Sequence, residues 1–264
     1  MASDDLFAAE ATSTAAAHAP LAERMRPRSL DEYAGQEHIL GPGKLLRRAI
    51  EADRFSSVVL YGPPGTGKTS LAEIIARTTE ARFERLSGVE STVAEMRKVM
   101  AAAALRLARD GTRTVLFIDE IHRFNKAQQD VLLPDVERGT VRLIGATTMN
   151  PFFYVNSPLV SRSLVFELRP LSSANLRALL DRALTDAERG LGARKISLDE
   201  EAAAHLAEIC DGDARRCLNA LELAALTTEP SADGAIRLTR AIIEESIQRK
   251  AVVYDAKDDA HYDT

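Results

Sequence analysis

Eight consecutive residues combine glycines, a lysine and a threonine at a spacing suited to binding phosphate. They are Gly62, Pro63, Pro64, Gly65, Thr66, Gly67, Lys68 and Thr69, which match G-x-x-x-x-G-K-[ST] in full. Glycines adopt backbone angles closed to other residues, so successive N–H groups can turn toward one anion at a helix N-terminus. Lys68 would then neutralise the β- and γ-phosphates of a nucleotide, and the Thr69 hydroxyl would bind Mg²⁺. The alternative is a glycine-rich turn that binds nothing, and a full match between an apolar run at 58–61 and a helical pattern argues against it.

A pair of carboxylates, Asp119 and Glu120, directly follows the apolar run 114–118. Asp119 can hold Mg²⁺ opposite Thr69, directly or through water, and Glu120 can polarise an attacking water. Isolated Asp-Glu pairs are common on protein surfaces, so this assignment depends on the preceding strand and on the phosphate loop upstream. A guanine-specific site would require Asn-Lys-x-Asp, and residues 125–128 lack the aspartate, so adenine is favoured.

The elements that must position these residues alternate between strands and helices. This alternation predicts an α/β fold with a five-stranded, doubly wound parallel sheet, whose ligands gather at the carboxyl ends of the strands. The phosphate loop, the acidic pair and the Thr147-Thr148 pair each follow a strand, so one sheet edge should collect all three. The expected strands are 57–61, 83–86, 114–118, 141–147 and 164–168. The expected helices are 44–52, 69–78, 92–108 and 125–137, the last interrupted or ended by Pro134.

The pattern divides the chain into four parts. Residues 1–20 are predicted to be a disordered tail, 21–170 the nucleotide-binding α/β domain, 171–254 a small all-helical domain, and 255–264 a linker toward a further domain. Helical spacing recurs at 176–183, 199–209, 214–226 and 239–249. Two Ser-x-x-Glu patterns, at 29–32 and 197–200, predict capping boxes that open helices.

Composition excludes several classes of protein. The chain has 264 residues, 45% of them apolar, and a net charge of −5 that is concentrated in its two ends. No strongly basic footprint is present, so DNA binding must be argued from other features. No apolar run approaches the ~20 residues that span a bilayer, and no secretory signal is present, which makes the cytoplasm the expected location. Cys210 and Cys217 lack metal-site spacing and are expected to be small buried hydrophobes.

Several stretches together resemble the AAA+ ATPases of the clamp-loader branch, most closely the family of replication-associated recombination protein A (RarA, or MgsA) and the Werner-helicase-interacting ATPase. The likeness covers residues 21–264, and its most particular feature is the Ile-His-Arg-Phe-Asn-Lys run after the acidic pair. The stretches are 62–69, 116–126, 145–151, 161–163 and 212–216. The sequence departs from the family in two respects. Met149 stands where the family usually has an acidic residue. The family's helical C-terminal oligomerisation domain is not found in this sequence, and this second departure calls assembly and robust activity of this chain into question.

The resemblance implies roles for further residues. Thr148, or the adjacent Thr147, would be the polar sensor that contacts the γ-phosphate or the attacking water. Arg162 would be an arginine finger reaching into a neighbouring subunit's site, and Arg215 a sensor in the helical lid domain that closes over the γ-phosphate. The implied cofactors are ATP and Mg²⁺.

The function implied by the resemblance is ATP-dependent DNA maintenance in replication and recombination, with hydrolysis stimulated by DNA ends, gaps or stalled forks. The expected partners are such DNA, single-strand DNA-binding protein and other copies of the chain, in a cytoplasmic, nucleoid-associated setting and with no membrane. A sliding clamp is a further candidate, because residues 3–7 loosely resemble clamp-docking peptides, although chance similarity is the better interpretation.

Three alternatives remain at this stage. Within the same branch, the chain could be a clamp-loader subunit or a branch-migration motor. A protein unfoldase would grip polypeptide with an aromatic loop after the second strand, and residues 86–91 contain no aromatic. A nucleotide-gated scaffold would bind without turnover, and Glu120 argues against that.

Overall fold

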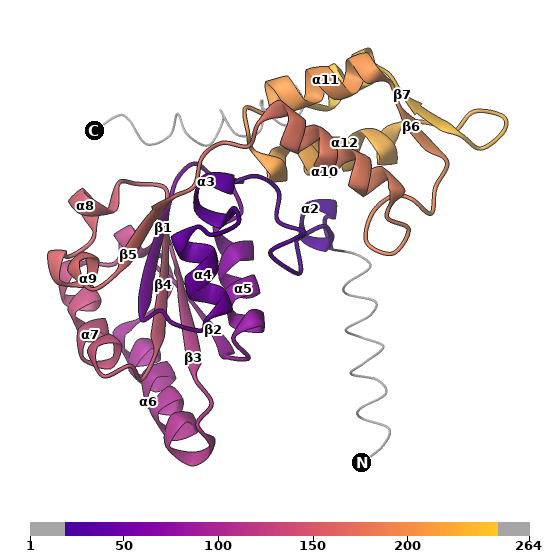
Figure 1. Ribbon diagram of the computed structural model, residues 1–264. Coiled ribbons are helices and arrows are strands. Elements are labelled where there is room, and N and C mark those ends of the chain that lie inside the picture. Colours follow the sequence, from indigo (N-terminus) through magenta and orange to yellow (C-terminus); the bar gives the residue numbers. More distant parts are fainter. Residues whose placement is uncertain (1–18, 248–264) are drawn as a thin grey trace. The chain divides into compact units, whose positions relative to one another are not determined.

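The computed structural model describes residues 19–247, which form two compact units (Figure 1). One unit comprises residues 27–170; the other comprises residues up to Arg26 together with those from Leu171 onward. Residues 21–26 therefore belong to the second unit, whereas the sequence pattern assigned them to the α/β domain. The reason is packing. Leu21 lies in α2 (Leu21–Arg24) and Met25 directly follows that helix. Both side chains are buried in the hydrophobic core of the helical unit.

A five-stranded parallel sheet forms the centre of the 27–170 unit, in the order β2-β3-β4-β1-β5. The strands are β1 (Ser57–Tyr61), β2 (Arg82–Ser87), β3 (Thr114–Asp119), β4 (Arg142–Thr147) and β5 (Leu164–Glu167). The expected fold class and all five expected strands are confirmed, with ends shifted by at most one residue. Because every strand is parallel, the carboxyl ends of β1, β3 and β4 meet at one edge.

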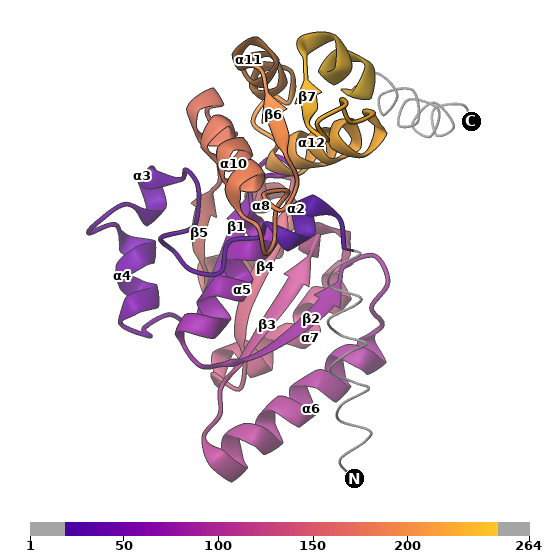
Figure 2. The same cartoon turned by 90° about the vertical axis from the view of Figure 1, so that its right-hand side faces the viewer.

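Helices cover both faces of the sheet, as Figures 1 and 2 show. One face packs against α4 (Leu45–Glu51) and α5 (Lys68–Thr78), and the other against α6 (Val93–Asp110) and α7 (Lys126–Glu137). Side chains along a strand alternate between faces, so Val115 and Phe117 of β3 join the first core while Leu116 and Ile118 join the second. Shorter elements of this unit are α3 (Glu37–Leu40), η1 (Ile121–Arg123), α8 (Pro151–Tyr154) and α9 (Ser157–Ser161).

Two local expectations for this unit were wrong. Pro134 does not end α7, which continues to Glu137; burial of Leu132 and Val136 offsets the backbone hydrogen bond that proline cannot make. The capping box at 29–32 opens no helix. The Glu32 N–H does donate to the Ser29 hydroxyl (3.3 Å), but the chain forms only a turn before left-handed backbone at Gln36.

The second unit is built from α10 (Ser173–Thr185), α11 (Glu200–Ile209), α12 (Ala214–Thr227) and a helical segment at 240–247. It also contains a parallel pair of short strands that the sequence pattern did not predict, β6 (Ile196–Leu198) and β7 (Ile236–Leu238). Ser197 lies within β6, so the second expected capping box is wrong too, and Asp199 is the N-cap residue of α11. Cys210 and Cys217 are buried as expected. Across residues 19–247, no helix is long and apolar enough to cross a membrane.

Candidate nucleotide site

The phosphate loop connects β1 to α5 and takes backbone conformations that its glycines make accessible. Gly62, Gly65 and Gly67 have φ angles of 145°, 71° and 94°, and Gly67 is the N-cap residue of α5. The Gly62 N–H donates to the Thr147 carbonyl at 3.2 Å, which joins the loop to the end of β4. The loop therefore begins beside β4 and ends at a helix N-terminus, where backbone N–H groups favour an anion.

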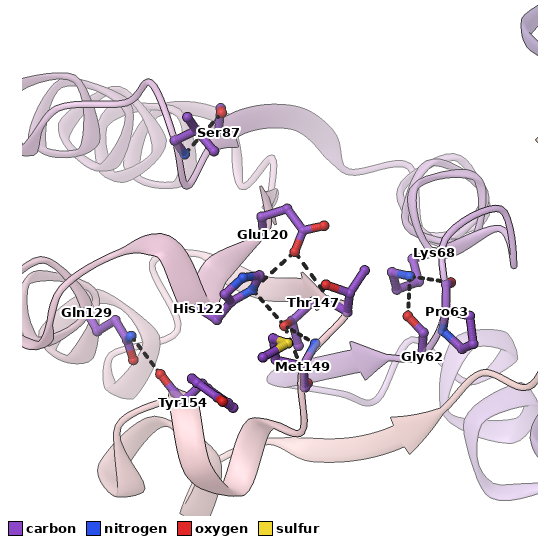
Figure 3. Close-up of polar contacts among 12 residues, drawn as sticks. Gly62, Pro63, Lys68, Ser87, Glu120, His122, Gln129, Thr147, Met149 and Tyr154 are labelled. Carbon is purple, nitrogen blue, oxygen red and sulfur yellow. Dashed lines mark hydrogen bonds and ion pairs between the residues drawn. The ribbon is translucent and has the colours of Figure 1, made fainter. Parts of the chain in front are cut away.

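Lys68 lies inside this loop and is 9% exposed. Its ammonium donates to the Gly62 and Pro63 carbonyls at 2.7 and 2.8 Å, as Figure 3 shows. These carbonyls are neutral acceptors, and a phosphate oxygen is a stronger, charged one. Lys68 can therefore exchange the loop carbonyls for a nucleotide phosphate. Thr69 follows as the second residue of α5 and is half-buried.

Tyr33 supports the loop from outside it, and sequence reasoning missed this residue. Its hydroxyl donates to the Thr66 carbonyl at 3.0 Å. Burial raises the pKa of the Tyr33 phenol, so the group stays protonated and remains a donor at neutral pH. Tyr33 lies in an irregular stretch with no periodicity, so no sequence signal could have identified it.

Asp119 ends β3, next to Ser87 in the neighbouring strand β2. Its carboxylate pairs with the guanidinium of Arg85 at 2.8 Å, a second contact that the sequence analysis missed. Arg85 also lies 5.8 Å from the centre of the Phe117 ring. Residues 85, 117 and 119 share one face of the sheet because register and alternation place them there. An arginine thus occupies one oxygen of the carboxylate that was predicted to hold Mg²⁺.

Glu120 follows Asp119 in left-handed backbone, with φ of 51°, an uncommon conformation for a residue other than glycine. One carboxylate oxygen, Oε2, accepts from the Thr148 N–H at 3.4 Å and lies 3.1 Å from Nδ1 of His122. The same Nδ1 lies 2.8 Å from the Thr147 hydroxyl (Figure 3). The turn at Glu120 thus brings its carboxylate to the end of β4.

The two candidate sensor threonines differ in surroundings. Thr147 is fully buried, and its hydroxyl contacts His122 and accepts the Met149 N–H at 2.9 Å. Thr148 is exposed and contacts Glu120 through its backbone N–H. The structure therefore places both beside Glu120 but leaves only the Thr148 side chain open to a ligand.

The two predicted arginines lie on different units. Arg162 follows α9 and is half-exposed; it pairs with Glu137 at 2.8 Å and donates to the Pro158 carbonyl at 3.0 Å. Arg215 is the exposed second residue of α12 in the helical unit. The finger role of Arg162 and the sensor role of Arg215 stay predictions.

The arrangement fits a nucleotide with Mg²⁺. Within residues 19–247, no group of three or more His, Cys, Asp or Glu side chains could hold a metal by itself. Mg²⁺ commonly keeps waters and binds through one or two protein oxygens together with substrate phosphates, which is the role open to Thr69 and Asp119. The loop glycines, Lys68 and the α5 N-terminus supply the phosphate side of such a site.

Comparisons with known proteins agree with this arrangement. A family model described as the Holliday junction DNA helicase RuvB P-loop domain matches residues 25–152, and one described as the AAA C-terminal domain matches residues 192–264. Replication-associated recombination protein A of Escherichia coli K12 is 47% identical over 92% of this chain and 54% of its own length. The ATPase WRNIP1 of Dictyostelium discoideum is 40% identical over 93% of this chain and 30% of its own length.

The comparison with solved structures also finds similarity to RuvB. The structure titled Thermotoga maritima RuvB Holliday junction branch migration motor has a TM-score of 0.66 and 32% identity, covering 86% of this chain and 73% of that one. The chain spans about half the length of its bacterial replication-associated relatives, 54% in the Escherichia coli protein.

Proposed function

We propose a function on the premise that this chain belongs to the AAA+ family of P-loop ATPases that contains replication-associated recombination protein A and RuvB. Members of this family use ATP with Mg²⁺. The proposed function is ATP-dependent DNA maintenance in replication and recombination, with hydrolysis stimulated by DNA ends, gaps or stalled forks. The observation that carries the proposal is the gathering of the phosphate loop, the acidic pair and the threonine pair at the carboxyl ends of β1, β3 and β4.

Each residue of the site has a proposed task. Lys68 releases the loop carbonyls and binds the β- and γ-phosphates. Thr69 and Asp119 would hold Mg²⁺, which would neutralise part of the phosphate charge. Glu120 accepts a hydrogen bond from the attacking water through Oε1, which has no hydrogen-bond partner among the described residues. Thr148, beside Glu120, contacts the γ-phosphate or the same water.

A neighbouring copy of the chain is proposed to complete the site. Arg162 would leave Glu137 and reach the γ-phosphate bound by the adjacent protomer, where an arginine finger accelerates transfer by roughly 10³ to 10⁵. Arg215, in the helical unit, is proposed as the sensor of the γ-phosphate. A solitary protomer should therefore hydrolyse ATP slowly.

The further partners are proposed from the family resemblance. DNA, single-strand DNA-binding protein and self-assembly are proposed, together with a cytoplasmic, nucleoid-associated location. The sliding-clamp proposal depends on residues 3–7, which lie outside the described part of the chain. A second function, a branch-migration motor, is favoured by the similarity to the RuvB structure. The replication-associated relatives match at higher identity, so DNA maintenance is the first proposal.

ATPase rates with gapped duplex, forked DNA, a four-way junction and an unfolded protein test these functions. The DNA-maintenance proposal expects strong stimulation by ends, gaps or forks. Preference for the four-way junction supports the branch-migration motor, and stimulation by unfolded protein alone would overturn both. Glu120→Gln is the control for turnover at this site. This variant should bind ATP as the wild type does, but its ATP turnover should be lower by about 10² to 10⁴, the usual contribution of a general base.

A further inference from the structure

Helix α8 exposes aromatic side chains that the packing of the fold does not use. Phe152, Phe153 and Tyr154 are 64%, 82% and 48% exposed, and no other phenylalanine or tyrosine among residues 19–247 is exposed. The Tyr154 ring contacts His122 edge to face, at 6.3 Å between ring centres, whereas the described residues offer no ring contact to Phe152 or Phe153. Two adjacent rings left in water are the kind of apolar surface that marks a binding site.

Hydrogen bonds at both ends hold α8 in place. The Asn150 side chain caps the helix by accepting the Phe152 N–H at 3.1 Å. At the other end, the buried amide of Gln129 donates to the Tyr154 carbonyl at 3.3 Å (Figure 3) and to the Phe124 carbonyl at 2.9 Å. The helix is therefore fixed to the junction between η1 and α7. Its phenylalanines are presented to a ligand without the entropy cost of ordering a loop.

Two positively charged side chains lie at the same junction. Arg123 ends η1 and Lys126 begins α7, and both are exposed. Within the part of the chain that the structure describes, neither side chain forms an ion pair or a hydrogen bond. The Asn156 amide, two residues after α8, donates to the Lys126 carbonyl at 3.0 Å and to the Asp130 carboxylate at 2.8 Å. The acid at this junction therefore has a partner, while the two cations are open to an anionic ligand.

Single-stranded DNA matches this combination of rings and cations. Its bases have flat faces that stack on aromatic side chains, and its phosphates accept hydrogen bonds from lysine and arginine. A duplex keeps the base faces stacked inside and presents only phosphates and groove edges. A protein partner fits less well, because lysine is depleted from protein–protein interfaces.

We propose that the two exposed phenylalanines of α8 and the two neighbouring cations form a binding site for single-stranded DNA, called the α8 patch below. The patch comprises Phe152, Phe153, Arg123 and Lys126. Bases stack on the phenylalanines, and phosphates contact the cations. This inference rests on the proposed function, which makes DNA a ligand of the chain, and it adds the site and the strand state.

A short stretch of chain joins the α8 patch to the residues proposed to act in hydrolysis. Only Met149 and Asn150 separate Thr148 from α8, and the Thr148 N–H donates to Glu120 at 3.4 Å. A strand bound to α8 can therefore displace the groups that surround the attacking water. The concentration of single-stranded DNA that half-maximally stimulates ATPase activity should thus rise whenever binding at the patch is weakened.

Anisotropy titration of a labelled oligothymidylate with the complete 264-residue chain is the first test. Phe152→Ala and Phe153→Ala together should weaken binding by about 5- to 150-fold, the effect of losing one stacked base. Tyrosine at both positions should keep the affinity within about twofold because it retains an aromatic face, and leucine should not, because it is apolar without one. Leu105→Ala on α6, a 72% exposed residue of the same unit, should equal wild type.

Salt dependence separates the cations from the rings. Each phosphate contact contributes a slope of about −0.7 to a plot of log affinity against log salt concentration for a single strand. Arg123→Ala with Lys126→Ala should therefore make the slope shallower by about 1.4. The double alanine variant at 152 and 153 should weaken binding at every salt concentration without changing the slope. Lys98→Ala, an exposed cation on α6, is the matched control and should keep the wild-type slope.

Tryptophan fluorescence reports on the site directly. The chain contains no tryptophan, so Phe153→Trp places a single indole in the α8 patch. Stacking of a thymine base should quench the indole as oligothymidylate saturates the protein. Leu105→Trp should show no quenching, because α6 lies outside the patch.

Several results would overturn the inference. They are wild-type affinity in the double alanine variant, equal affinities in the leucine and tyrosine variants, an unchanged salt slope without the two cations, and an unquenched indole. If the double alanine variant instead changes the oligomeric state in sedimentation and keeps its affinity for oligothymidylate, α8 is an interface between copies.

Failure of this inference can be told apart from failure of the proposed function. If gapped or forked DNA stimulates the wild-type ATPase but oligothymidylate does not bind, or binds equally well to the double alanine variant, only the α8 patch is refuted. If no DNA binds the wild-type chain or stimulates its ATPase, both proposals are wrong.

Discussion

A methyl group added at Gly67 tests whether the phosphate loop depends on its left-handed backbone and on Tyr33. In Gly67→Ala, the new Cβ would lie 2.4 Å from the Tyr33 hydroxyl and 2.9 Å from the ring carbon that bears it. The φ angle of 94° adds backbone strain for any residue with a side chain. Something must move, and the movable group is Tyr33, whose hydroxyl then leaves the Thr66 carbonyl.

The expected cost can be worked from these two contributions. A left-handed alanine costs about 1 to 2 kcal/mol, and loss of the Tyr33–Thr66 hydrogen bond costs about 1 kcal/mol. The free energy of unfolding should therefore fall by about 2 to 3 kcal/mol, which lowers Tm by roughly 4 to 12 °C. If the loop relaxes to a less strained conformation, ATP binding must restore the original loop conformation. The affinity for ATP should then fall roughly 5- to 30-fold.

Denaturant unfolding and titration with a fluorescent ATP analogue measure the two effects. In a Tyr33→Ala background the collision is gone, so Gly67→Ala should cost only its backbone part and the double-mutant cycle should show about 1 kcal/mol of coupling. An unfolding free energy within about 0.5 kcal/mol of wild type, below the backbone strain alone, would refute the reasoning for Gly67. An equal cost in both backgrounds would refute the part assigned to Tyr33.

Three further predictions concern charged side chains. Arg85→Ala removes the ion-pair partner of the Asp119 carboxylate. The Mg²⁺ concentration that gives half-maximal ATPase activity should therefore fall about 1.5- to 5-fold, which corresponds to the free energy of a partly exposed ion pair. A higher Mg²⁺ requirement in this variant would contradict the prediction. Arg162→Ala should bind ATP normally and hydrolyse it slowly, and mixing it with a phosphate-loop variant should restore turnover if the finger acts between protomers; no recovery in mixed assemblies argues for action within one chain. The Arg142 guanidinium lowers the pKa of Asp53, so the pair stabilises the fold above the ordinary aspartate pKa and this stability is lost as pH falls through the folded pKa. When the free energy of unfolding is measured as pH is lowered, Asp53→Asn should lose less stability than the wild type. Identical pH profiles of the two proteins would exclude a stabilising contribution from the Asp53–Arg142 pair.

The sequence by itself determined the sheet, the phosphate loop and the acidic pair. These features are local: alternating or continuous apolar runs predict strands, and the loop needs glycines, a lysine and a threonine at fixed spacing within eight residues. Wherever a strand ends, the next residues are at the edge of the sheet, so the position of Asp119 followed from the run before it. Prediction was weaker where a local signal competed with packing, as at Pro134 and at the two expected capping boxes.

Only the tertiary structure decided which side chains meet around that site. Tyr33 with Thr66, Arg85 with Asp119, and His122 with Thr147 are separated by 33, 34 and 25 residues. Their contacts depend on a strand order, β2-β3-β4-β1-β5, that differs from the order along the chain. No local pattern encodes such pairs, because each contributes about 1 kcal/mol and forms only after burial of the apolar strands has brought its partners together.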